Sequence, residues 1–157
     1  MKKSSWKQLL LFLLFPLAVG ALASLLTASA MESFSQLPKP RFSPPAWLFP
    51  VVWTLLYLLM GFSSYLVLNS EQSTARARHL YLLQLVFNFF WPILFFRLQL
   101  YFPAFIWLVL LWLLIYAAME EFYQIKREGA YLLLPYLLWV TFAGYLNFAV
   151  WQLQSKP

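Results

Sequence analysis

Amide and aromatic side chains recur at helical spacing inside the apolar stretches of this 157-residue sequence. Gln84 and Asn88 are four residues apart and Trp91 follows three residues later, so one helical face would carry all three. Such a face can line a pocket, where amides orient a flat ligand and indoles stack on it. Alternatively, the amides bond neighbouring membrane helices, a contribution of about 0.6 kcal/mol each. Spacing alone favours neither interpretation.

Two further stretches carry a similar stripe, with an aromatic, amide or small residue at every fourth position. The first stripe consists of Pro135, Trp139, Ala143, Asn147 and Trp151, and the second of Trp53, Tyr57 and Gly61. Residues four apart lie on the same helical face. We therefore expect three helices to turn these side chains toward a common interior.

The residues needed for most enzyme chemistry are missing. The sequence has no Cys, no Asp and one His, and its Glu residues all lie outside the apolar stretches. No Ser-His-Asp set, metal cluster, phosphate loop or pair of intramembrane carboxylates can be assembled. Charged groups within a membrane usually mark ion or proton routes, so their absence argues against a pump. His79, beside Arg78 at the edge of a stretch, fits an exposed helix end better than a haem ligand.

Composition indicates that much of the surface faces lipid. Hydrophobic residues make up 63% of the chain and charged residues 10%, against roughly 25% charged in soluble domains. Five stretches lack Asp, Glu, Lys and Arg, and about 20 apolar residues suffice for a spanning helix. We expect an all-α integral membrane protein, a five-helix bundle forming one domain over residues 1–157. The predicted spans are 8–30, 46–68, 79–97, 98–120 and 130–153.

The basic residues predict the orientation in the membrane. Five spans put the N-terminus and the second and fourth loops on one side, with Lys2, Lys3, Lys7, Arg76, Arg78, Lys126 and Arg127. The other side holds Lys39, Arg41, Arg97 and Lys156. The excess predicts a cytoplasmic N-terminus in the cell membrane. Basic clusters between apolar runs also favour lipid headgroups over nucleic acid as the partner.

The first span has an alternative interpretation as a cleaved signal peptide, because Ala28-Ser29-Ala30 resembles a cleavage site. However, the uncharged run from Leu9 to Leu26 has 18 residues, and signal peptides usually have an apolar region of about 7–15. We therefore expect this span to be retained.

Prolines shape the first loop and the third span. The loop predicted at 31–45 is Pro-rich and stiff, which suits a lid better than a tether, although a plain connector is the alternative. Ser43 followed by Pro44 predicts a helix start with Ser43 as the N-cap. Pro92 lies deep in the third span, where it predicts a kink.

Three blocks of sequence resemble the TspO/translocator protein family, also called TspO/MBR or tryptophan-rich sensory proteins. They are LPKPRFSPPAWLFPVVWTLLYLLMG at 37–61, QLVFNFFWPILFF at 84–96 and YLLLPYLLWVTFAGYLNF at 131–148. The resemblance implies a five-helix bundle, often dimeric, with one pocket capped by the first loop. Its implied ligands are tetrapyrroles such as protoporphyrin IX and haem, with no required cofactor.

Carried over by position, the resemblance implies a set of ligand-binding residues. They are Phe34, Pro44, Pro45, Trp53, Asn88, Trp91, Trp139, Ala143 and Asn147. Many members have Trp-Tyr where this chain has Ser33 and Phe34, so one polar contact and one oxidisable group are missing here. No basic residue follows Tyr145 within five positions, so the sterol-recognition pattern is absent.

Three functions compete. The favoured one is tetrapyrrole binding for porphyrin transport, sequestration or stress regulation. The second is light-dependent oxidative degradation of porphyrin, with Trp53 and Trp139 as redox-active catalytic residues. The third is a non-enzymatic structural or regulatory role. A homodimer is implied by the resemblance alone, because no Gly-x-x-x-Gly motif occurs.

Overall fold

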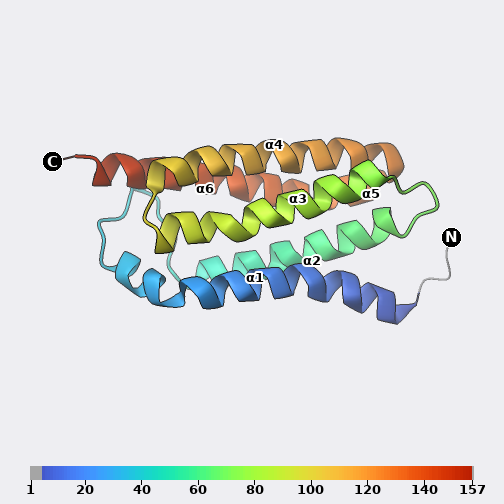
Figure 1. Ribbon diagram of the computed structural model, residues 1–157, viewed down its shortest axis with the longest axis horizontal. Helices are drawn as coiled ribbons and strands as arrows, with labels where there is room; N and C mark the ends of the chain where they lie inside the picture. Colours follow the sequence, from blue (N-terminus) through green and yellow to red (C-terminus); the bar gives the residue numbers. More distant parts are fainter. Residues whose placement is uncertain (1–4, 157) are drawn as a thin grey trace.

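The computed structural model describes residues 5–156, and within them it contains helices and no strand. The elements are α1 (Trp6–Ser35), α2 (Leu48–Leu68), α3 (Ala75–Pro92), η1 (Ile93–Arg97), α4 (Tyr101–Ile125), α5 (Arg127–Leu132) and α6 (Leu134–Gln154). With η1 continuing α3 and α5 preceding α6, five helical segments are long and apolar enough to cross a membrane. They run side by side along the long axis of the molecule (Figure 1). The prediction of an all-α bundle with five spans is confirmed.

The helices pack around a shared core. α1 packs along α2 and, near its end, against η1, while α3 packs on α4 and α4 on α6. α5 joins α2 and α4 at one end of the bundle. α2 and α6 also lie next to each other, but they touch at only a few positions. α2 meets α3 at equally few positions, so α2 is loosely packed against both α3 and α6.

The first loop is shorter than predicted. α1 continues to Ser35, so the loop spans 36–47 rather than 31–45. The prediction that Ser43 caps the second helix is wrong, because α2 begins at Leu48 after Trp47. The Ser43 hydroxyl instead donates to the Pro40 carbonyl over 2.9 Å. The physical reason is the Pro44-Pro45 pair, since a residue that precedes proline disfavours helical backbone angles.

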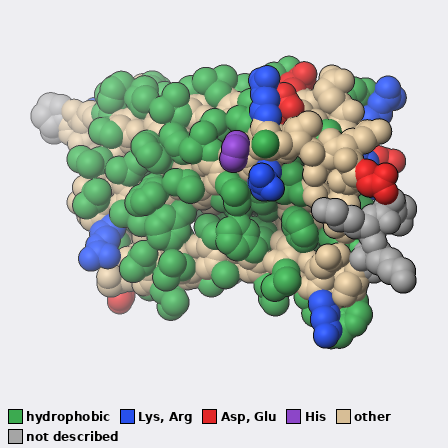
Figure 2. Space-filling view, turned by 45° about the vertical axis from the view of Figure 1, so that its right-hand side comes forward, with side chains coloured by type: hydrophobic (Ala, Val, Ile, Leu, Met, Phe, Trp, Pro, Cys, Tyr) green, Lys and Arg blue, Asp and Glu red, His purple; other side chains and the backbone are tan. Residues whose placement is uncertain are grey.

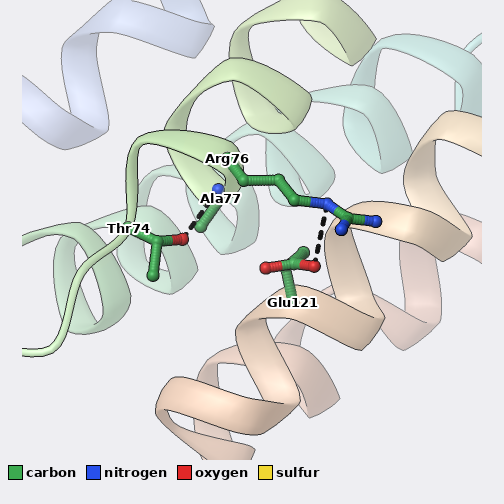
Figure 3. A network of polar contacts seen from close by, with 4 residues as sticks. All are labelled: Thr74, Arg76, Ala77 and Glu121. Carbon is green, nitrogen blue, oxygen red and sulfur yellow. Dashed lines mark hydrogen bonds and ion pairs between the residues drawn. The ribbon is translucent and has the colours of Figure 1, made fainter.

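The third and fourth helices extend beyond the charge-free stretches (Figure 3). α3 begins at Ala75, where Thr74 Oγ1 accepts a hydrogen bond from the Ala77 N–H over 3.1 Å. Arg76 Nε lies 3.0 Å from Glu121 Oε1, which joins the start of α3 to the end of α4. The Arg76 side chain is 76% exposed, so this pair contributes at most about 1 kcal/mol. Charged residues at the bundle end thus continue the helices, and charge-free stretches underestimate helix length.

One proline lies where the helix type changes, and another lies just after a break between two α-helices. α3 ends at Pro92 and gives way to the π-helix η1, where the Leu98 N–H donates to the Ile93 carbonyl over 3.0 Å. The backbone thus changes helix type where the sequence predicted a kink in a continuous helix. Pro135 lies in the first turn of α6, directly after the break at Leu133 that separates α5 from α6.

The outside of the bundle is apolar in the middle and charged near its ends. Figure 2 shows hydrophobic side chains over most of one face, with Lys, Arg and Glu side chains gathered mainly toward one end. The start of α1, the α2–α3 loop and the α4–α5 junction share that end, and the C-terminus lies at the other (Figure 1). This is an integral multi-pass membrane protein. Lys2 and Lys3 lie outside the described residues, and the cytoplasmic placement of the N-terminus stays a prediction.

Candidate ligand-binding core

A buried chain of hydrogen bonds joins α2, α3 and α6. The Tyr57 hydroxyl donates to Asn88 Oδ1 over 2.6 Å, and Asn88 Nδ2 donates to the Tyr136 hydroxyl oxygen over 2.8 Å. The Tyr136 hydroxyl in turn donates to Gln84 Oε1 over 2.8 Å. None of the four side chains is more than 8% exposed. Because each tyrosine has one proton to give, the chain of hydrogen bonds runs in a single direction. It ends at Gln84, whose Nε2 has no acceptor among the described residues.

Close helix packing holds Tyr57 in place. Gly20 of α1 faces the Tyr57 ring, and a Cβ at position 20 would overlap it. One turn further along α2 from Tyr57, Gly61 lies against the backbone of Phe12 and Leu13, where an added Cβ would meet the Phe12 carbonyl oxygen at 2.5 Å. Both contacts need the absence of a side chain. The small residue of the Trp53-Tyr57-Gly61 stripe therefore serves the α1–α2 contact.

Asn147 forms a second set of interhelical bonds nearer the loop end. Its Oδ1 accepts from Trp91 Nε1 over 3.0 Å, and its Nδ2 donates to the Tyr101 carbonyl over 2.7 Å. These bonds connect α6 to α3 and to the start of α4. Asn88 and Asn147 thus both form hydrogen bonds between helices, which is the alternative role considered for such amides. Their contact with a ligand stays a prediction.

Trp53 lies at the centre of an aromatic cluster. Its ring centroid is 5.7 Å from that of Tyr57, 6.5 Å from that of Trp91 and 6.3 Å from that of Tyr136. Contributions of this kind are worth roughly 0.5–1.5 kcal/mol per pair beyond the buried area. Residues far apart in the sequence therefore build one aromatic wall over the hydrogen-bonded chain.

Trp139 packs on the same core from α6. Its ring contacts Phe49 at 5.8 Å and Phe142 at 5.6 Å between centroids. Its Nε1 is buried and has no acceptor, as is also true of Gln84 Nε2. Ala143, one turn further along α6, is 5% exposed and belongs to the core. The described side chains thus leave two buried donors unsatisfied.

Phe34 covers the loop end of the core. Its ring meets Phe95 at 5.3 Å and Phe96 at 5.1 Å, and Phe95 stacks on Trp91 at 5.5 Å. The 36–47 loop is tied to α6 by a hydrogen bond from the Tyr145 hydroxyl to the Arg41 carbonyl at 3.3 Å. In this loop, Pro44 is half-buried and Pro45 is exposed. The structure therefore brings Phe34 to Trp91 through η1, whereas Pro45 lies on the loop surface.

Two grooves run along the lipid-facing side of α6. The α2–α6 groove, of about 530 Å³, is lined by Val52, Leu55, Leu56, Leu59, Pro135, Leu138, Trp139 and Phe142. The α4–α6 groove, of about 440 Å³, includes Trp112, Thr141, Gly144 and Tyr145. Both are open grooves rather than enclosed cavities.

The side chains that most often hold metal ions lie apart among residues 5–156. No three His, Cys, Asp or Glu side chains gather there in a group that could hold a metal ion. His79 is exposed in the first turns of α3.

Comparison with known proteins identifies the family. The chain matches the TspO/MBR family over residues 12–152. The chain belongs to the TspO/MBR family. A relative, the tryptophan-rich protein TspO of Chlorobaculum tepidum, is 38% identical over 141 residues, which cover 87% of this chain and 89% of the relative. The tryptophan-rich sensory protein of Cereibacter sphaeroides is 37% identical over 152 residues, or 94% of each chain. The translocator protein of Bos taurus is 32% identical over 152 residues, or 94% of this chain and 90% of the relative.

The TspO/MBR blocks coincide with the core just described. The blocks at 37–61, 84–96 and 131–148 include α2, α3 and α6 residues that build the hydrogen-bonded chain and the aromatic cluster. The resemblance inferred from sequence is confirmed. Sequence reasoning did not select Tyr136, which lies at the junction of the chain. Its position three to four residues before Trp139 and Val140 on α6 was the available signal.

Proposed function

We propose that this TspO/MBR protein binds a tetrapyrrole such as protoporphyrin IX or haem in the aromatic core between α2, α3 and α6. The supporting observation is the pairing of an indole-rich wall, around Trp53, with two buried donors that lack acceptors, Gln84 Nε2 and Trp139 Nε1. A flat macrocycle stacks favourably on indoles. An unsatisfied buried donor costs about 1–3 kcal/mol, and an acceptor on a ligand relieves that cost.

Charge suggests how such a ligand would lie. The carboxylates of protoporphyrin IX or haem need cationic or aqueous surroundings, because a bare charge in the core is very unfavourable. Lys39, Arg41 and Arg97 are exposed at the loop end. The ligand would therefore direct its carboxylates toward these residues and place its ring system in the core.

Binding requires the core to open. The Trp53 ring already packs on Trp91 and Tyr136, so the macrocycle must displace aromatic contacts. The contacts to be displaced are aromatic ring contacts. We assign the protein a role in sequestering, presenting or moving porphyrins, with no cofactor required. Relatives are named sensory protein and translocator protein, and both names fit such a role.

Titration of the purified protein with protoporphyrin IX tests this function. The protein should be placed in lipid nanodiscs, and binding followed by the absorbance and emission of the porphyrin. Saturable binding with one ligand per chain is expected. Lack of saturable binding would refute the proposal and leave a structural or regulatory role.

A second candidate function is light-driven porphyrin degradation. The observation that favours it is the close set of oxidisable rings, with Trp53 6.5 Å from Trp91 and 5.7 Å from Tyr57. Illumination of the same complex, followed by chromatography, separates the two functions. A new product that forms over repeated turnovers supports an enzyme, and intact porphyrin after illumination supports binding alone.

A further inference from the structure

The α2–α6 groove reaches from the lipid-facing surface to the core. Leu55 and Leu138 form its outer part and are 56% and 61% exposed. Leu56, which also lines it, is 3% exposed and belongs to the buried core. All of these side chains are apolar. α2 and α6 touch at only a few positions, as do α2 and α3. The Tyr57–Asn88 hydrogen bond joins α2 to α3, so the groove marks a loosely packed seam on the lipid-facing surface.

In contrast to the α2–α6 groove, the loop end of the core is closed. Phe34 packs edge-on against Phe95 and Phe96. The Tyr145 hydroxyl ties the 36–47 loop to α6 through the Arg41 carbonyl. An apolar ligand dissolved in the bilayer would also have to cross the charged headgroup layer to enter there. The seam between α2 and α6 avoids both obstacles.

Trp139 lines the α2–α6 groove and also packs against the core. No hydrogen bond holds its indole. Its Nε1 has no acceptor, and its ring contacts Phe49 and Phe142. By contrast, Trp91 and Trp112 are held by bonds to the Asn147 and Thr141 side chains. Rotation of Trp139 therefore breaks no hydrogen bond.

The α4–α6 groove provides an internal comparison. There Trp112 Nε1 donates to Thr141 Oγ1 over 2.9 Å, directly between the two helices. α4 and α6 also pack along much of their length. This groove is similar in volume to the other and also reaches core residues, Leu108 and Val140, but a hydrogen bond and packing along much of their length hold its two helices together.

We propose that the α2–α6 seam is the lateral entrance through which a tetrapyrrole passes from the bilayer into the core, with Trp139 as its gate. This inference rests on the proposed function and adds the route to it. The ligand is a flat, largely apolar ring system that partitions into lipid. An acceptor on its edge takes the Trp139 N–H as it passes.

Crosslinking across the seam tests the route. The chain has no cysteine, so Leu55→Cys with Leu138→Cys gives a unique pair for a flexible, reducible bis-maleimide. The folded double variant, in nanodiscs, should be mixed with vesicles carrying protoporphyrin IX, and binding followed by porphyrin absorbance. Crosslinking should slow association by about tenfold or more, and reduction of the linker should restore it. The control pair, Val109→Cys with Phe148→Cys, closes the α4–α6 groove and should leave the rate unchanged.

Release provides the second measurement. Porphyrin loaded before the α2–α6 crosslink should stay trapped, whereas Trp139→Ala should speed both association and release. Equal rates with and without the crosslink, in protein that binds porphyrin, would overturn the lateral route. Unchanged rates in Trp139→Ala would overturn the gate. If the parent protein binds no porphyrin in any form, the proposed function itself has failed.

Discussion

Removal of one hydroxyl group at Tyr136 tests whether the buried chain supports the bundle. Tyr136 is 0% exposed, and its hydroxyl both accepts from Asn88 and donates to Gln84. Tyr136→Phe keeps the ring and its contact with Trp53 but deletes both hydrogen bonds. Interhelical bonds in membrane proteins contribute about 0.6 kcal/mol on average and about 1.7 at most. Loss of two bonds should therefore lower the free energy of unfolding by about 1–3 kcal/mol.

Two further variants test whether the loss of stability follows the number of hydrogen bonds removed. Tyr57→Phe deletes the single bond from its hydroxyl to Asn88, so it should cost about 0.6–1.7 kcal/mol. Tyr116→Phe changes a side chain that is 47% exposed on α4 and should stay within about 0.5 kcal/mol of the parent. Unfolding should be measured in one detergent for all three, by loss of helical circular dichroism and by steric trapping. Tyr136→Phe with parental stability would refute the chain as a source of stability.

The remaining predictions concern packing, redox chemistry and the N-terminus. Gly61→Ala should lower the free energy of unfolding by about 1–3 kcal/mol, because the added methyl overpacks the α1–α2 contact. Gly144→Ala is the control, since its Cβ would meet only a Leu108 atom at 3.9 Å, and it should leave the melting temperature unchanged. Trp53→Phe and Trp139→Phe should retain most of the porphyrin affinity measured by titration, because stacking area is kept. Any light-driven degradation should fall sharply in both variants but not in Trp6→Phe, and parental degradation rates would exclude the two indoles. N-terminal sequencing of the membrane-extracted protein should start ahead of α1, since α1 packs along α2, and a start after α1 would show cleavage.

The stripe of residues spaced by four on α6 shows how far sequence periodicity predicts the core. Asn147 and Ala143 are buried, Trp139 is half-buried and Pro135 is exposed. A helix has 3.6 residues per turn, so a run of residues spaced by four drifts around the helix and leaves the core. A mixed spacing of four and three would have kept to the buried face and selected Tyr136 in place of Pro135.

Other features depend on contacts that a single sequence does not reveal. The five spans follow from composition, because any helix-forming apolar stretch of this length suits the bilayer. The partners of Asn88 and Asn147 depend on which helices become neighbours, and the spacing along one helix contains no such information. The same holds for Gly20, whose role is to admit the Tyr57 ring from another helix.

The single direction of the buried chain has a consequence for signalling between helices. The donors run from Tyr57 on α2, through Asn88, to Tyr136 and Gln84. One proton per tyrosine means that the order reverses only if both amides turn over together. In the reversed order Gln84 would present its oxygen at the end of the chain, and the Tyr57 proton would be left without an acceptor. Whatever group meets Gln84 on α3 therefore also determines the hydrogen-bonding state of a hydroxyl on α2, with no helix having to move.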